Sequence, residues 1–496
     1  MSSVATFDTG IILFYFGLIL FAGFWVSRIS AADSSSFFLA NRSIGWIAIG
    51  TSLFAANISS EHIVGLAGYG ASRGLAVGSI ELLAIPFLIF LGWWLAPLFL
   101  KTKVFTVPEF LGKRFNAGTR LILSGISIFA YVLTKISVSL YAGGLLLNAI
   151  LGWDMHTSAI LMVVITGLYT IVGGLRAVVY TSVIQSAFLI LGAVIITFLG
   201  LQEVGGIAGL QSKLPADYFS ILKPVSDPDF PWTGILFGAP ILAIWYWCTD
   251  QYIVQRIFSA RDLQAARKGS LLTAFLKTLP IFTLVLPGLL AAALFPGISG
   301  DDAFPALVSS SILPDGLKGI VLAGVLSALM SSLSACFIST STLFTMDFYR
   351  YFNPAAGEKK LVLIGRLATI AMVVVGILWV PLVKLINSHV YIHLQSVQAY
   401  ISPPIAAVFL MGLFWKRANG RGAIISLCIG EAFGALRLSL ELFGSPGLAD
   451  SHAFGWFLGI NFLHFAVLSF ILSILMMILG SLLTDAPEIQ YFQENI

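Results

Sequence analysis

Several ionisable and amide side chains lie inside runs of apolar residues that are long enough to span a membrane. Lys277 lies in the middle of the apolar run 271–294, and Glu61, Glu81 and Gln395 also lie within or at the start of such runs. A charged side chain at membrane depth is costly unless it lines a water-filled cavity or meets a partner. These residues therefore predict a polar, water-filled site enclosed by apolar helices.

A second set of polar groups offers uncharged oxygen atoms. The centre of the run 44–66 reads AANISSEH, and small polar residues of this kind compete for backbone hydrogen bonds and favour a broken helix. Ala328, Ser331 and Ser332 are spaced i, i+3, i+4 and share one helix face. Two hydroxyls and freed carbonyls would supply about five hard oxygen ligands, which suits Na⁺. The alternative is a small-residue face on which two helices pack closely.

Aromatic residues occupy positions 245–247, near the middle of the apolar run 232–255, where an interfacial belt would not place them. Aromatic rings stack on the apolar faces of sugars, whose hydroxyls need carboxylate and amide partners. The following Asp250 and Gln251 could serve an inner vestibule or cap a helix, and the structural role is favoured.

The composition is that of a polytopic membrane protein. Of 496 residues, 58% are hydrophobic and 10% are charged, and the mean hydropathy is +0.96. A net charge of +4 is too small to indicate nucleic-acid binding. No nucleophile triad, metal spacing or phosphate loop is apparent, so we do not expect an enzyme. Cys248, Cys336 and Cys428 are expected to be small buried hydrophobes rather than disulfide partners.

We expect thirteen transmembrane helices. They would cover residues 8–27, 44–66, 77–99, 121–150, 156–175, 178–201, 232–255, 270–295, 317–349, 362–386, 396–414, 422–443 and 455–482.

The basic residues of the loops predict the orientation. One alternating set of loops holds 19 of the 27 lysines and arginines, and the opposite set holds 5. The positive-inside rule places the first set in the cytoplasm, the N-terminus outside and the C-terminus inside. The long acidic loops 202–230 and 296–316 are expected to be solvated caps over the outer face.

Six stretches of the chain resemble the sodium:solute symporter family, and within it the sodium/glucose cotransporters. They are FAANISSEHIVGLAGYG, LTKISVSLYAG, LYTIVGGLRAVVYT, LAIWYWCTDQYIVQR, LSALMSSLSACFISTSTLFTMDFY and QSVQAYISPPIAAVFLMGLFWKR. They follow the family's order from residue 54 to residue 417 and so cover nearly the whole chain.

The resemblance implies an all-α polytopic membrane protein with a LeuT-like core of two inverted five-helix repeats and broken helices. The whole chain, 1–496, would be one transporter domain, with repeats at about 44–203 and 231–416. The helices at 8–27, 422–443 and 455–482 would be peripheral.

The resemblance also implies two sets of site residues. Those for the solute are Asn57, His62, Glu81, Tyr246, Trp247, Lys277 and Gln395. Those for Na⁺ are Ala55, Ile58, Ala328, Ser331 and Ser332, the set that spacing also suggests. Tyr246 would close under the sugar ring and bond the residue at position 57. Glu81 and Lys277 would partly neutralise each other.

One departure from the family bears on stoichiometry. Many relatives carry an Asp where this chain has Ser182. That Asp lies on the sodium exit route or helps to bind a second sodium ion, so its absence favours one Na⁺ per solute.

The function implied is Na⁺-coupled symport of a neutral hexose of the glucose or galactose type, by alternating access in the plasma membrane. The alternatives are symport of myo-inositol, a nucleoside or a sialic-acid-like sugar, and a sugar-gated sensor or cation leak. The partners would be a sugar, Na⁺ and the lipid bilayer, with the chain a monomer or homodimer. An organic acid would require an uncompensated arginine, whereas Arg437 is expected to form a peripheral polar patch with Glu431.

Overall fold

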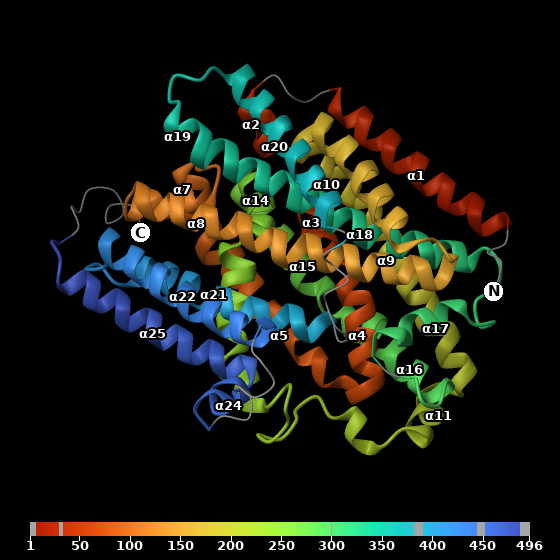
Figure 1. Ribbon diagram of the computed structural model, residues 1–496. Helices are drawn as coiled ribbons and strands as arrows, with labels where there is room; N and C mark the ends of the chain where they lie inside the picture. The colour runs from red at the N-terminus through yellow and green to blue at the C-terminus, as the bar shows by residue number, and fades with distance from the viewer. Residues whose placement is uncertain are drawn as a thin grey trace.

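The computed structural model of the protein describes residues 6–28, 33–298, 300–379, 381, 390–443 and 452–486. Within these residues the chain folds into closely packed helices (Figure 1). Eleven of the described helices are long and apolar enough to cross a membrane. The expectation of an all-α polytopic membrane protein is therefore confirmed.

The number of spans is a separate question. The continuous helical stretches Ser60–Thr102 and Met155–Val204 are 43 and 50 residues long. Each is long enough to contain parts of two predicted spans. The count of thirteen stays a prediction. The predicted span 362–386 runs partly beyond the described residues, and so does the C-terminal tail.

The helices of the first half of the chain are α1 (Thr6–Ser27), α2 (Ser34–Leu39), α3 (Trp46–Asn57), α4 (Ser60–Arg73), α5 (Gly78–Phe90), α6 (Ala96–Thr102), α7 (Val107–Arg114), α8 (Ala117–Ala130), α9 (Ser137–Leu151), α10 (Met155–Val204) and α11 (Gly206–Lys213).

Those of the second half are α12 (Trp232–Phe237), α13 (Ala239–Ala243), α14 (Gln251–Phe258), α15 (Leu263–Leu276), α16 (Leu286–Leu294), α17 (Ala303–Ser309), α18 (Leu317–Thr342), α19 (Arg350–Phe352), α20 (Glu358–Trp379), α21 (Val390–Phe414), α22 (Gly420–Phe443), α24 (His452–Gly459) and α25 (Phe462–Leu482). Five π-helical segments join or interrupt them: η3 (Leu91–Leu95), η4 (Tyr131–Ile136), η6 (Ile244–Thr249), η7 (Ile281–Val285) and η9 (Leu343–Tyr349).

Helix α18 lies at the centre of the bundle. It packs along α10, and α1 covers both helices from outside. Helices α21, α22 and α25 pack together, and Figure 1 shows α22 and α25 on the opposite side of the molecule from α1. Nearly every side chain of α18 is buried. The predicted cation-binding face of Ser331 and Ser332 is therefore in the interior of the protein.

Helix α10 changes direction at Gly174, whose backbone has φ 57° and ψ −152°. Only glycine adopts this conformation readily. A Cβ atom at this position would lie 2.4 Å from the carbonyl oxygen of Phe37. The kink falls at the end of the predicted span 156–175, just before the predicted span 178–201. The continuous helix α10 therefore contains two segments that run in different directions.

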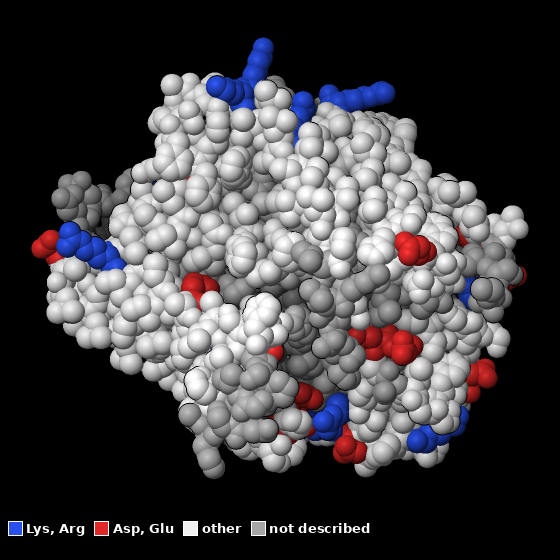
Figure 2. Space-filling model, viewed as in Figure 1, with Lys and Arg blue, Asp and Glu red and all other residues white. Residues whose placement is uncertain are grey.

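Charged side chains are distributed unevenly over the surface. In the view of Figure 2, lysines and arginines gather along the edge where Figure 1 places α2, α19 and α20. Acidic side chains gather on the opposite half, near α11 and α17. The loop between α11 and α12 is fastened to α4, because the Tyr69 hydroxyl donates to Asp229 Oδ2 at 2.7 Å.

The expected pairing of Arg437 with Glu431 on helix α22 is wrong, and so is the expected burial of Cys428 on the same helix. Arg437 pairs with Glu441 at 2.7 Å rather than with Glu431, because residues four apart share a helix face and residues six apart do not. The Arg437 guanidinium also donates to carbonyl oxygens of Phe457, Leu458 and Ile460.

Cys428 is exposed, whereas Cys248 and Cys336 are buried as expected. Cys428 is exposed because it lies on the face of α22 that is turned to the surface of the protein. The segment around it is apolar although much of it is not buried inside the protein.

Replacing Gly174 by Ala should destabilise the protein. The residue would have to adopt a glycine-only conformation, which costs about 1–3 kcal/mol, and its methyl group would clash with Phe37. The control is Gly152→Ala, where φ is also positive at 68° but no atom lies within 4 Å. Thermal unfolding in detergent should show a clearly larger loss for Gly174→Ala; equal melting temperatures for the two variants would contradict this.

Candidate functional site

The first helix of the predicted core is broken where its sequence is small and polar. Helix α3 ends at Asn57 and α4 begins at Ser60. Between them, Ile58 and Ser59 have extended backbone conformations, with φ, ψ of −79°, 109° and −120°, −178°. The last carbonyl groups of a helix lack partners within it. The predicted break is confirmed, and it leaves carbonyl groups of α3 free to bind other groups.

Helix α18 supplies the partners of those carbonyls. The Ser331 hydroxyl donates to the carbonyl oxygen of Ala55 at 2.6 Å, and it also lies 3.1 Å from that of Ala328. The Ser332 hydroxyl donates to the carbonyl oxygen of Ala56 at 3.2 Å. The structure thus brings together the predicted cation ligands, with Ile58 in the break itself. These hydroxyls and carbonyls are uncharged hard oxygens, which fit a monovalent cation.

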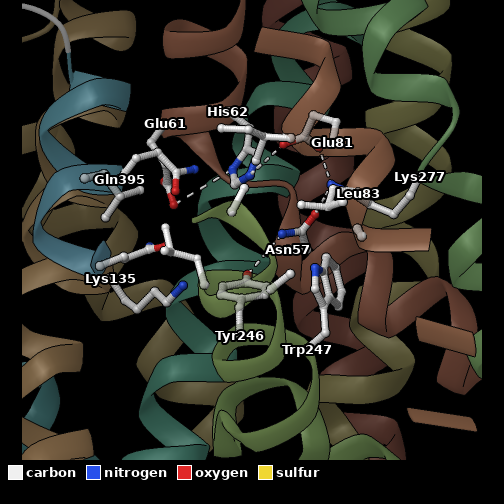
Figure 3. Close-up of a pocket in the computed structure, with 17 residues that line it drawn as sticks. Asn57, Glu61, His62, Glu81, Leu83, Lys135, Tyr246, Trp247, Lys277 and Gln395 are labelled. Atoms are coloured by element: carbon white, nitrogen blue, oxygen red, sulfur yellow. Dashed lines mark hydrogen bonds and ion pairs between the residues drawn. The ribbon is translucent and has the colours of Figure 1, made fainter. Parts of the chain in front are cut away.

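A pocket lies beside the break, and Figure 3 shows its lining. The lining includes all seven residues predicted to bind the solute: Asn57, His62, Glu81, Tyr246, Trp247, Lys277 and Gln395. Their side chains come from α3, α4, α5, η6, the end of α15 and α21. Asn57 and Gln395, which are 338 positions apart in the chain, therefore share one cavity.

A continuous chain of polar contacts crosses the pocket. The Lys277 ammonium contacts the Glu81 carboxylate and donates to Asn57 Oδ1 at 2.7 Å. Asn57 Nδ2 in turn donates to the Tyr246 hydroxyl at 3.1 Å. The predicted pairing of Glu81 with Lys277 and the predicted contact of Tyr246 with position 57 are both present (Figure 3). Lys277 also lies 5.5 Å from the centre of the Trp247 ring.

His62 lies between two carboxylates (Figure 3). Its Nε2 is 3.8 Å from Glu81 Oε1 and its Nδ1 is 4.0 Å from Glu61 Oε1. Its Nδ1 also contacts the Ser59 hydroxyl at 3.1 Å. The Ser59 contact holds the imidazole beside the break, where His62 lines the pocket.

Three polar residues of the lining were not among the predicted site residues. They are Glu61, Lys135 and Gln398. Glu61 stood out as a polar residue in an apolar run, but no role was assigned to it. The position of Lys135 inside a predicted span was the same signal that identified Lys277. The Ser139 hydroxyl donates to Glu61 at 3.5 Å, and the Glu61 carboxylate lines the pocket.

Asp250 and Gln251 have structural roles, as the favoured interpretation predicts. Asp250 caps α14 by accepting from the Tyr252 amide, and it also contacts the Tyr131 hydroxyl. The Gln251 amide bonds the backbone of Phe105 and Val107. These contacts join the first half of the chain to the second.

Ser182 is fully buried on α10. Its hydroxyl has no hydrogen-bond partner among the described residues. Serine here brings no charge to the region beside α18, in contrast to the carboxylate that the family resemblance leads one to expect.

A model of the sodium:solute symporter family matches residues 37–430 of the chain. The chain belongs to this family. The symporter is 37% identical to Sodium/glucose cotransporter 4 of Danio rerio, over 97% of its own length and 79% of that protein. It is 41% identical to a sodium/mannose cotransporter of Bos taurus, over 97% of its own length and 87% of that protein. It is 40% identical to Sodium/myo-inositol cotransporter 2 of Bos taurus, over 88% of its own length and 70% of that protein.

The fold of the symporter matches that of a Na⁺-coupled sialic acid symporter solved in a substrate-bound outward-open state. The TM-score is 0.84 at 21% sequence identity, with 97% of this chain and 99% of that one covered. Family membership confirms the resemblance drawn from the six sequence stretches. It places the protein among transporters rather than enzymes.

The Glu81–Lys277 pair generates a prediction for stability. Both side chains are almost completely buried, so Lys277→Met alone would leave an unpaired buried carboxylate, at a cost of about 3–5 kcal/mol. The double variant Glu81→Gln/Lys277→Met should regain most of the lost thermal stability but no solute binding. The measurements are melting temperature and ligand binding in detergent. Normal solute affinity in a folded Lys277→Met protein would leave only a structural role for the pair.

Proposed function

We propose that the protein is a symporter that couples the entry of Na⁺ to the uptake of a neutral hexose, by alternating access. The observation that carries this proposal is the shared break between α3 and α4. Its Ala55 carbonyl lies in the oxygen-rich cation set, and its Asn57 side chain lies in the solute pocket two residues further on. One short segment of backbone therefore belongs to both sites.

The charges of the pocket support a neutral solute. Glu61 and Glu81 are matched by Lys135 and Lys277, so no cation is left over to attract an anion. Carboxylates accept hydrogen bonds from hydroxyls, ammonium groups donate to them, and Trp247 offers an apolar face for a sugar ring. The relatives named for glucose, mannose and myo-inositol all point to the same chemical class, a neutral polyol.

In the proposed mechanism Na⁺ is a transported ion. Ala55, Ile58, Ala328, Ser331 and Ser332 would hold it. The ion would replace the Ser331–Ala55 hydrogen bond with ion–oxygen contacts and so set the conformation of the break.

Solute hydroxyls would then exchange with the internal contacts of Glu81, Lys277 and Asn57. Tyr246 would close the pocket on the side of Asn57. His62, Trp247 and Gln395 would complete the contacts with the solute.

The membrane arrangement forms part of the proposal. The first helix of each predicted repeat is broken, at Ile58–Ser59 and at Asp250, which supports two inverted repeats at about 44–203 and 231–416. The basic edge in Figure 2 supports a cytoplasmic side near α2, α19 and α20. The protein would lie in the plasma membrane with its N-terminus outside.

Tracer uptake into proteoliposomes tests the function. An inward Na⁺ gradient should drive accumulation of glucose or galactose, with competing mannose and myo-inositol revealing the preferred polyol. Because Ser182 brings no carboxylate, we expect a Hill coefficient near one for Na⁺ and a charge-to-solute ratio of one. Na⁺-dependent current without tracer uptake would indicate a sensor or leak instead, and a ratio of two would refute the single-ion stoichiometry.

Replacing Ser332 by Ala should weaken Na⁺ activation. Loss of one buried ligand costs roughly 1–3 kcal/mol, which raises the Na⁺ concentration for half-activation by about five- to 150-fold. The matched control is Ser327→Ala, because the Ser327 hydroxyl is equally buried on α18 but donates to the carbonyl of Ala323 within its own helix and lies outside the predicted cation set. Unchanged Na⁺ activation in a folded Ser332→Ala protein would remove Ser332 from the cation site.

A further inference from the structure

Lys135 is a buried lysine at the pocket with an unusual set of contacts. It lies in the π-helical segment η4, is 4% exposed, and lines the cavity. Its ammonium is 4.2 Å from the centre of the Tyr246 ring and 4.8 Å from that of Tyr252. Within the described part of the chain this ammonium group makes no hydrogen bond. The two aromatic rings are therefore its main direct contacts, and the carboxylates of Asp250 and Glu61 act on it electrostatically.

The hydroxyl groups of the two tyrosines are hydrogen-bonded at different sites. The Tyr246 hydroxyl accepts a hydrogen bond from Asn57 in the solute pocket. The Tyr252 hydroxyl donates to the carbonyl oxygen of Ala56 at 2.6 Å, which also accepts from Ser332 at 3.2 Å. One ring is thus bonded to the solute pocket and the other to the backbone beside the cation site.

No continuous helix holds these two rings together. Tyr246 lies in η6 and Tyr252 in α14, and the backbone between them is extended at Asp250, with φ −72° and ψ 119°. Their ring centres are 6.5 Å apart and inclined at 56°. Lys135 comes from the first half of the chain and contacts both rings across this break. Its cation can therefore hold their relative orientation. Figure 3 shows Lys135 beside the Tyr246 ring.

We propose that Lys135 is a positioning residue that couples solute binding to cation binding through Tyr246 and Tyr252. When the solute displaces Tyr246, the contact with the ammonium changes. Lys135 and Tyr252 then shift, and the hydrogen bond to the Ala56 carbonyl changes beside the cation ligands. This inference rests on the proposed symport function, and it explains how the two sites communicate beyond their shared break.

The experiment measures coupling rather than activity. Na⁺ affinity is determined with and without solute, and solute affinity with and without Na⁺, in purified wild type and variants. The coupling ratio is the fold-change in Na⁺ affinity caused by solute. By linkage it must equal the fold-change in solute affinity caused by Na⁺, and such ratios are typically about five- to 150-fold. Lys135→Met removes the cation but keeps an unbranched side chain, and it should reduce the ratio to below about twofold while each ligand alone still binds. Lys135→Arg keeps a cation over the rings and should retain the wild-type ratio.

The matched control is Lys213→Met, at an exposed lysine of α11, which should leave the ratio unchanged. A wild-type ratio in Lys135→Met would overturn the proposal. So would a parallel loss of both affinities with the ratio preserved, because that is the behaviour of a purely structural counter-ion. A wild-type protein without Na⁺-driven solute uptake would refute the proposed function itself, so the two failures are distinguishable.

Tyr252→Phe tests the same path if Lys135→Met fails to fold. This variant keeps the ring under the ammonium but removes the hydrogen bond to the Ala56 carbonyl. It should also lower the coupling ratio, by at least about threefold if the wild-type value lies in the usual range. Full coupling in a folded Tyr252→Phe protein would overturn the path from Lys135 to the cation site.

Discussion

The structure depends on the absence of water from the hydrocarbon core of a membrane. There, a backbone carbonyl without a partner is strongly unfavourable, so irregular backbone is tolerated only where protein or a polar cavity satisfies it. The break at Ile58–Ser59 meets this condition because Ser331 and Ser332 of α18 reach its carbonyls. Helix α18 must therefore be innermost, with α10 and α1 packed over it.

The same constraint governs the charges. Lys277 is neutralised by Glu81 and held by Asn57. Lys135 is placed over two aromatic rings within the field of two carboxylates. Because each charge is compensated inside the protein, the cavity as a whole favours a neutral ligand. The compensating contacts are hydrogen bonds and ion pairs that a hydroxyl group can replace, so the arrangement that stabilises the empty pocket also prepares it for a polyol.

Departures from regular helix mark the functional region. The helix break at Ile58–Ser59 and the π-helical segments η4 and η6 adjoin one cavity, and the break at Asp250 directly follows η6. A π-helical turn accommodates one more residue than an α-helical turn and often occurs at functional sites. Here these segments carry Lys135, Tyr246 and Trp247. Local irregularity in the helices is thus a condition for bringing these side chains together.

The sequence alone predicted the membrane class, the broken helix and the serine face of α18. These features depend on composition, on polar residues inside apolar runs and on i, i+3, i+4 spacing, all of which are local along the chain. The same local signal was available for Lys135, but only its contacts in space show that its ammonium lies against the rings of Tyr246 and Tyr252. The set of seven residues expected at the solute pocket came from the resemblance to the family.

Only the tertiary structure decided which side chains meet. It placed Tyr252 against the Ala56 carbonyl, paired Arg437 with Glu441 instead of Glu431, and left Cys428 at the surface. Such contacts depend on how each helix is rotated about its axis and which neighbour it faces. An apolar run with one polar residue predicts that a partner is needed, but the packing of the whole bundle selects that partner.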